Sequence, residues 1–124
     1  MSGKGIILFG HGARNPEYVQ PFQRIRAALL ALEPQAEVEI GFLELTQPSF
    51  EAAVDALTAR GIRQITVVPI FFAPGRHVLK DLPPLAASAM DRHPDLAIEI
   101  APAVGESPLV VDAMARFALA SANA

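Results

Sequence analysis

The sequence has no cysteine among its 124 residues. This absence excludes disulfides, thiolate catalysis, zinc ribbons and iron–sulfur clusters. A metal ion would have to be held by histidine, carboxylate or backbone groups, which suit divalent Co, Ni, Fe or Zn better than Cu(I). The sequence also has no excess of positive charge. The net charge is −3, so nothing indicates a protein that binds nucleic acid electrostatically.

Long hydrophobic runs and phosphate-binding glycine motifs are missing as well. The longest apolar run, residues 65–74, is too short to span a bilayer and contains two prolines. Neither a Walker A loop nor a G-x-G-x-x-G pattern occurs, which argues against nucleotide enzymes. No secretory signal is visible, so we expect a cytoplasmic protein with no membrane contact. The hydrophobic fraction of 52% is ample for one core, and we expect a single domain over residues 1–124.

Apolar runs and amphipathic stretches alternate four times along the chain. The pattern predicts strands over residues 5–10, 37–43, 65–72 and 97–101, and helices over residues 16–33, 48–60, 81–92 and 108–121. The first and third strands are almost uninterrupted apolar runs, as expected for central parallel strands, whereas the other two alternate like edge strands. Each helix carries one apolar stripe, which we interpret as core. In the first helix the stripe is Phe22, Ile25, Leu29 and Leu32, and in the last helix it is Val110, Met114 and Phe117.

Proline and small polar residues mark the predicted helix starts. Asn15, Asp81 and Ser107 are plausible N-caps, and prolines follow each of them within the first turn. Gly61 is the predicted stop of the second helix. Repeated strand–helix units with right-handed crossovers predict an α/β fold, a three-layer, doubly wound parallel sheet of four strands in the order 2-1-3-4.

Two of the three histidines follow the predicted central strands. His11 comes directly after the first strand, between Gly10 and Gly12, and His77 follows the third strand and a short turn. In the order 2-1-3-4, the topological switch point lies between these two strands, where open α/β sheets bind their ligands. The two histidines are therefore predicted to face each other across one crevice, both in loops. His93 lies at a helix end, and we expect no function for it.

Charged residues accompany the two histidines. Glu44 ends the second strand and is either a base or third ligand, or a surface carboxylate near a helix amino terminus. Arg14, Arg76 and Lys80 either are ordinary surface charge or form a positive mouth for an anionic ligand.

Three segments resemble a known family. They are residues 11–14 (His-Gly-Ala-Arg), residues 43–45 (Leu-Glu-Leu) ahead of Pro48, and residues 68–72 (Val-Pro-Ile-Phe-Phe) leading into residues 75–83. Together they resemble the small class II tetrapyrrole chelatases, in particular the short sirohydrochlorin chelatases of the CbiX type, over essentially the whole chain. One residue departs from the family pattern, because Ala13 stands where serine is common.

The resemblance implies a fold, a reaction and a site. Larger relatives have two such lobes in one chain, so this chain would form a homodimer to build the cleft. The reaction would insert Co²⁺, with Fe²⁺ or Ni²⁺ as alternatives, into sirohydrochlorin, with no organic cofactor and the metal as a substrate. His11, His77 and Glu44 would bind the metal and take up pyrrole protons. Arg14, Arg76, Lys80, Gly10 and Gly12 would contact the tetrapyrrole.

Two other functions are also compatible with these residues. A histidine-phosphatase-like enzyme would use His11 as nucleophile, with Arg14 and His77 on the phosphate. Such enzymes need an arginine directly before the nucleophile, where this chain has Gly10. A non-catalytic carrier of metal or tetrapyrrole would use the same pocket as a chelatase and the same ligands.

Overall fold

The sheet has four parallel strands in the predicted order. The computed structural model describes residues 4–73 and 75–124, with the backbone alone for residues 76–79. The strands are β1 (Lys4–Gly10), β2 (Val38–Phe42), β3 (Gln64–Pro69) and β4 (Ala97–Ile100), paired in the order β2-β1-β3-β4. Leu8 of β1 lies opposite Ile40 of β2 and Val68 of β3. The doubly wound topology is thus confirmed, with β1 and β3 in the centre.

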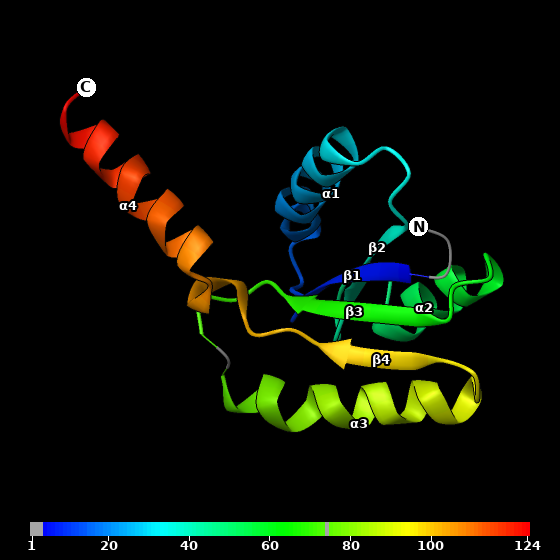
Figure 1. Ribbon diagram of the computed structural model, residues 1–124. Helices are drawn as coiled ribbons and strands as arrows, with labels where there is room; N and C mark the ends of the chain where they lie inside the picture. The colour runs from blue at the N-terminus through cyan, green and yellow to red at the C-terminus, as the bar shows by residue number, and fades with distance from the viewer. Residues whose placement is uncertain (1–3, 74) are drawn as a thin grey trace.

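Helices cover the two faces of the sheet unequally (Figure 1). Alternate residues of β1 point to opposite faces. Ile7 and Phe9 pack in a cluster with α2 (Phe50–Ala59) and α3 (Arg76–Arg92). The other face carries α1 (Gln20–Leu32), whose Phe22 packs with residues of β1 and β2. The apolar stripe predicted for α1 is core at Phe22 but not at Leu32, which is 88% exposed.

Several helix ends follow the predicted capping chemistry. The Asn15 side chain accepts a hydrogen bond from the Glu17 amide at the start of a 3-10 turn, η1 (Pro16–Val19). Ser107 caps α4 (Pro108–Ala122) by accepting from the Leu109 amide. Gly61 adopts φ +86° just after α2. These polar groups satisfy amides that have no partner inside the helix.

The start predicted for the third helix is wrong. The helix α3 begins at Arg76, not at residue 81, and Asp81 lies inside it and not at its N-cap. Two prolines misled the prediction, since Pro83 and Pro84 stand inside the helix, where each removes a backbone hydrogen bond. Burial of Leu82, Ala86 and Ala89 against the sheet compensates for that loss.

The fourth helix does not pack as predicted. Figure 1 shows α4 projecting from the carboxyl end of the sheet, beyond a short 3-10 turn, η2 (Val104–Glu106). None of its residues is buried, and Phe117 is 76% exposed. The stripe Val110, Met114 and Phe117 is therefore a surface of this chain and not part of its core. None of the helices that the structure describes is long and apolar enough to cross a bilayer.

Candidate functional site

The carboxyl ends of β1 and β2 bring two candidate residues into direct contact. His11 Nε2 donates a hydrogen bond to Glu44 Oε2 over 2.9 Å, although the residues are 33 positions apart. Their side chains are 36% and 56% exposed, so both are accessible to a ligand. Two donor atoms bound to one metal ion by bonds of about 2.1 Å stand about 3 Å apart. The pair therefore already has a spacing suited to sharing a cation or a proton.

The backbone fixes this spacing by continuing the sheet ladder past the strand ends. The Leu43 amide donates to the Gly10 carbonyl over 3.0 Å, and the Glu44 amide donates to the His11 carbonyl over 3.1 Å. Gly12 adopts φ +103°, and a Cβ atom there would overlap the Glu44 carbonyl oxygen. Glycine is thus required at position 12 for the two loops to approach so closely.

A tight turn follows Glu44. The Thr46 amide donates to the Glu44 carbonyl over 2.7 Å, and Leu45 between them adopts φ +65°. A three-residue turn with positive φ at its centre is the rarer, strained form of the γ-turn. The Thr46 hydroxyl accepts from the Ala13 amide and donates to the Ala13 carbonyl, both over 2.8 Å. Thr46 was not predicted as a site residue, and its one signal in the sequence is its position two residues after Glu44.

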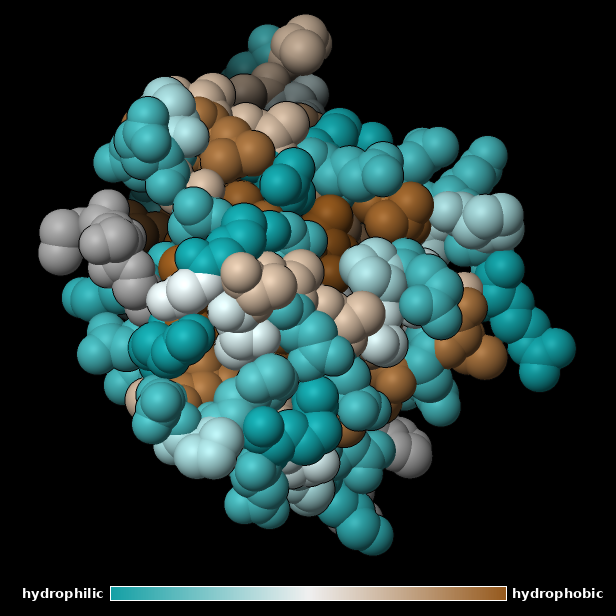
Figure 2. Space-filling view, turned by 90° about the vertical axis from the view of Figure 1, so that its right-hand side faces the viewer, coloured by the Kyte–Doolittle hydropathy of each residue, from teal (hydrophilic) through white to brown (hydrophobic). Residues whose placement is uncertain are grey.

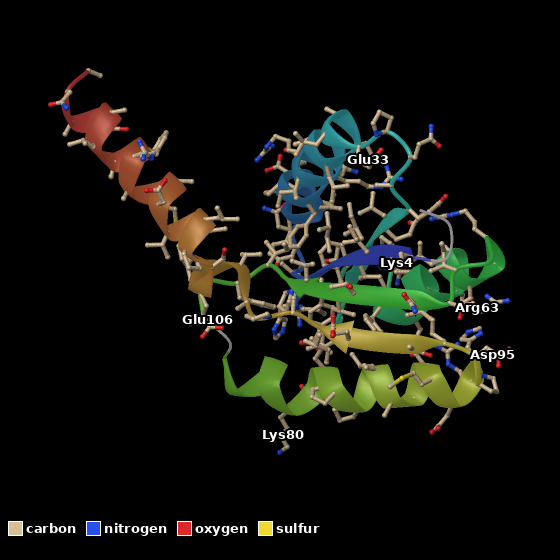
Figure 3. All side chains as sticks on the ribbon, viewed as in Figure 1. Lys4, Glu33, Arg63, Lys80, Asp95 and Glu106 are labelled. Carbon is tan, nitrogen blue, oxygen red and sulfur yellow. The ribbon has the colours of Figure 1, made fainter. Side chains whose placement is uncertain are left out.

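The other charged and histidine residues predicted for the site lie in the loop after β1 and in α3. His77 lies in the first turn of α3, not in a loop, and the side chains of Arg76 and His77 lie outside the described residues. Arg14 is exposed in the loop after His11. Lys80 projects from α3 away from the sheet (Figure 3). Among the side chains that the structure describes, no three histidines or carboxylates converge as a metal site.

Two shallow hollows flank the carboxyl edge of the sheet. One, of about 250 Å³, lies between the loops after β1 and β2 and is lined by Arg14, Leu45 and Thr46, among others. The other, of about 230 Å³, is almost entirely apolar. Its walls are Ile70, Phe71, Phe72, Val104, Gly105, Val110 and Met114. One half of the edge is thus polar and the other half offers an apolar wall.

The opposite end of the sheet carries a different cluster. Asp55 of α2 accepts hydrogen bonds from Arg92 Nη1 over 2.9 Å and from His93 Nε2 over 3.0 Å, at the rim of a hollow of about 460 Å³. The bonds from His93 and Arg92 lower the pKa of Asp55 below its ordinary 3.8. Figure 2 faces this end, where hydrophilic residues predominate over scattered hydrophobic ones. The cluster ties α2 to α3 and is remote from the pair of His11 and Glu44.

Curated sirohydrochlorin cobaltochelatases are similar in sequence to part of this chain. A sirohydrochlorin cobaltochelatase from Methanopyrus kandleri is 36% identical over 78 residues, which are 63% of this chain and 54% of that protein. One from Methanocaldococcus jannaschii is 31% identical over 90 residues, 73% of this chain and 63% of that protein. The match thus spans little more than half the length of these curated relatives.

Solved structures share the fold more completely. A CbiX protein from Marinobacter aquaeolei VT8 superposes with a TM-score of 0.85 at 27% identity, covering 97% of this chain and 98% of that one. The sirohydrochlorin chelatase SirB from Bacillus subtilis subspecies spizizenii, in complex with cobalt, has a TM-score of 0.72 at 29% identity, covering 81% of this chain and 43% of that one. The CbiX family model matches residues 5–119, nearly the whole sequence, and the chain therefore belongs to the CbiX family.

Proposed function

We propose that this protein inserts a divalent metal ion, Co²⁺ in the first place, into sirohydrochlorin. The observation that carries the proposal is the pair of His11 and Glu44, held 2.9 Å apart at the carboxyl edge of the sheet in a CbiX-family fold. The names of its relatives support the same substrate. Fe²⁺ and Ni²⁺ remain alternatives, because imidazole and carboxylate ligands accept several divalent ions.

Metal insertion is an exchange of one dication for two pyrrole protons. A suitable site holds the metal loosely, with open coordination positions, and offers bases for the protons. A neutral imidazole can do both, and a carboxylate beside it can share either task. We assign these roles to His11 and Glu44, with His77 at the start of α3 as the third group.

The tetrapyrrole would lie along the carboxyl edge of the sheet. Its flat apolar ring suits the wall formed by Phe71, Phe72 and Val104, and its carboxylates suit the cations Arg14 and Arg76. Gly10 and Gly12 would let the ring approach the backbone beside His11. Because Lys80 projects away from the sheet, its part would be long-range attraction and not direct contact.

We also propose that the protein works as a homodimer through α4. The stripe Val110, Met114 and Phe117 begins in the apolar hollow and continues along α4 without cover. The Marinobacter CbiX chain is matched over 98% of its length, whereas SirB is about twice as long as the matched part. A second copy therefore fits the uncovered face better than an unrelated partner, and a two-fold axis would pair the same patch on both copies.

An insertion assay tests the proposal. Sirohydrochlorin and Co²⁺ are mixed with the protein, and the change in the absorption spectrum is followed. We expect acceleration over the protein-free mixture, and at least a hundredfold loss of rate in His11→Ala and in His77→Ala, about the size that loss of a general base gives. His93→Ala is the matched control and should retain the full rate, since His93 lies at the other end of the sheet.

Two results would contradict the proposal. Binding of metal and tetrapyrrole without acceleration would identify a carrier in place of an enzyme. Full activity in His77→Ala would remove that residue from the site.

A further inference from the structure

We propose that Thr46 is a positioning residue for this site: its hydroxyl, bonded to both polar atoms of the Ala13 backbone, fixes the turn that presents Glu44 to His11. The inference rests on the proposed function, since it assigns Thr46 a part in the same reaction. The hydroxyl of Thr46 bonds to the Ala13 backbone, so its effect on His11 and Glu44 is transmitted through the two loops.

The geometry of the hydroxyl is that of a two-point attachment. A single oxygen, Thr46 Oγ1, accepts from the Ala13 amide and donates to the Ala13 carbonyl, each over 2.8 Å. Both bonds are partly buried, so water competes with them less than at an open surface. Serine or threonine is required for this contact, because the oxygen must donate and accept at once.

The bonds of the Thr46 hydroxyl join the two loops on the far side of the pair of His11 and Glu44. The ladder bond from the Glu44 amide to the His11 carbonyl holds the loops on the strand side of Glu44. The hydroxyl of Thr46 holds them on the other side, two residues further along each chain segment. The backbone of Glu44 is therefore fixed from both directions, and Gly12 lies between the two attachments on the other loop.

The turn formed by Glu44, Leu45 and Thr46 depends on these hydrogen bonds for its shape. Leu45 adopts φ +65°, a left-handed conformation that a leucine rarely takes, and its side chain is 61% exposed. An exposed side chain gives the turn little packing, so its conformation must be imposed by the surrounding hydrogen bonds. Loss of the hydroxyl would let Leu45 relax toward negative φ and would move Glu44 away from His11.

The test compares variants that differ in one hydroxyl. Thr46→Val keeps the shape and removes both hydrogen bonds, whereas Thr46→Ser keeps them. We expect Thr46→Val to lower kcat for Co²⁺ insertion by about tenfold or more, as for a misplacement of about 1 Å. The KM for sirohydrochlorin should change less than about twofold, since the tetrapyrrole wall is untouched. Thr46→Ser should stay within about twofold of the wild type in both constants.

A matched control and a second readout keep the outcome clear. Thr58→Val removes a hydroxyl that donates only within α2, to the Asp55 carbonyl, and should leave kcat unchanged. Hydrogen exchange of the Ala13 amide, measured without substrate, should accelerate in Thr46→Val and stay slow in Thr46→Ser. If Thr46→Val does not fold, Thr46→Ala serves in its place with the same expectations.

Several results would overturn the assignment. Equal kcat values for Thr46→Val and the wild type would do so, as would equal losses in Thr46→Val and Thr46→Ser. A wild-type protein without insertion activity would overturn the proposed function instead. In that case the exchange of the Ala13 amide still decides whether the hydroxyl holds the loop.

Discussion

At the scale of single residues, the close approach of the loops after β1 and β2 depends on glycine at position 12. Gly12 and Gly61 both adopt positive φ, so a comparison of the two positions separates this dependence from backbone strain. A Cβ atom at Gly12 (φ +103°) would overlap the Glu44 carbonyl oxygen, whereas a Cβ atom at Gly61 (φ +86°) would meet none of the described residues. Alanine at either position costs backbone free energy, but only at position 12 does it also force the site apart.

We therefore expect Gly12→Ala and Gly61→Ala to differ in activity more than in stability. Each should lower the free energy of unfolding by about 1 kcal/mol or more through the strained φ. Gly12→Ala should also abolish metal insertion, because the Cβ atom displaces Glu44 from His11. Urea denaturation and the insertion assay measure the two effects. Retention of activity by Gly12→Ala would show that the contact between the two loops is dispensable.

At the scale of elements, different interactions stabilise the sheet and the contact between α2 and α3. The strands are held by the ladder and by burial of residues such as Ile7 and Phe9. The contact of α2 with α3 also depends on charged side chains, because Asp55 of α2 pairs with Arg92 and His93 at the carboxyl end of α3. Since the Asp55 side chain is 54% exposed, solvent screening limits this contribution to at most about 1 kcal/mol.

The lowered pKa of Asp55 gives this contact a defined pH dependence. A carboxyl whose pKa is lower in the folded state stabilises the fold above its unfolded pKa, and this stability disappears as the pH falls through the folded pKa. We expect the wild type to lose this contribution below about pH 3.8, and Asp55→Asn to lack it at every pH.

Urea denaturation between pH 7 and pH 3 measures the difference between the two proteins. Asp112→Asn is the control, because Asp112 pairs with Arg116 of its own helix on the exposed surface of α4. The same acid dependence in Asp55→Asn and the wild type would rule out Asp55 as its source.

At the scale of the whole molecule, α4 stands apart from the layers that the other elements form (Figure 1). A helix with an uncovered apolar face gains free energy from a partner, and a partner that binds only the folded state raises the apparent stability by mass action. The stability of this protein should therefore depend on its own concentration if α4 pairs two copies.

We expect the thermal midpoint to rise with protein concentration in the wild type, as dimer formation becomes complete. Phe117→Ser should remove this dependence and give a monomer by light scattering. Leu119→Ser, on the other side of the same helix, is the matched control and should remain a dimer. A wild type that is monomeric at micromolar concentration, or a dimer unaffected by Phe117→Ser, would exclude this interface.

Local patterns predicted most of the architecture, and contacts between distant segments account for what they missed. The order of the strands followed from apolar runs and crossover handedness. The place of His11 and Glu44 at one edge followed from their positions at strand ends. Tertiary packing overrode the prolines of α3, and the stripe on α4 indicated an apolar face without indicating what covers it. Thr46 was missed because its bond to Ala13 joins residues 33 positions apart.

The ladder bonds beyond the ends of β1 and β2 also set the timescale on which the pair can act. The backbones of His11 and Glu44 are hydrogen-bonded to each other, so a slip of the strands by one residue, about 3.3 Å, would break the whole pairing. The motion that remains available is rotation about side-chain bonds, which takes picoseconds to nanoseconds in exposed residues. If the pair takes up a cation as proposed, rotation of the two side chains would therefore suffice, and the ends of the strands would not need to move.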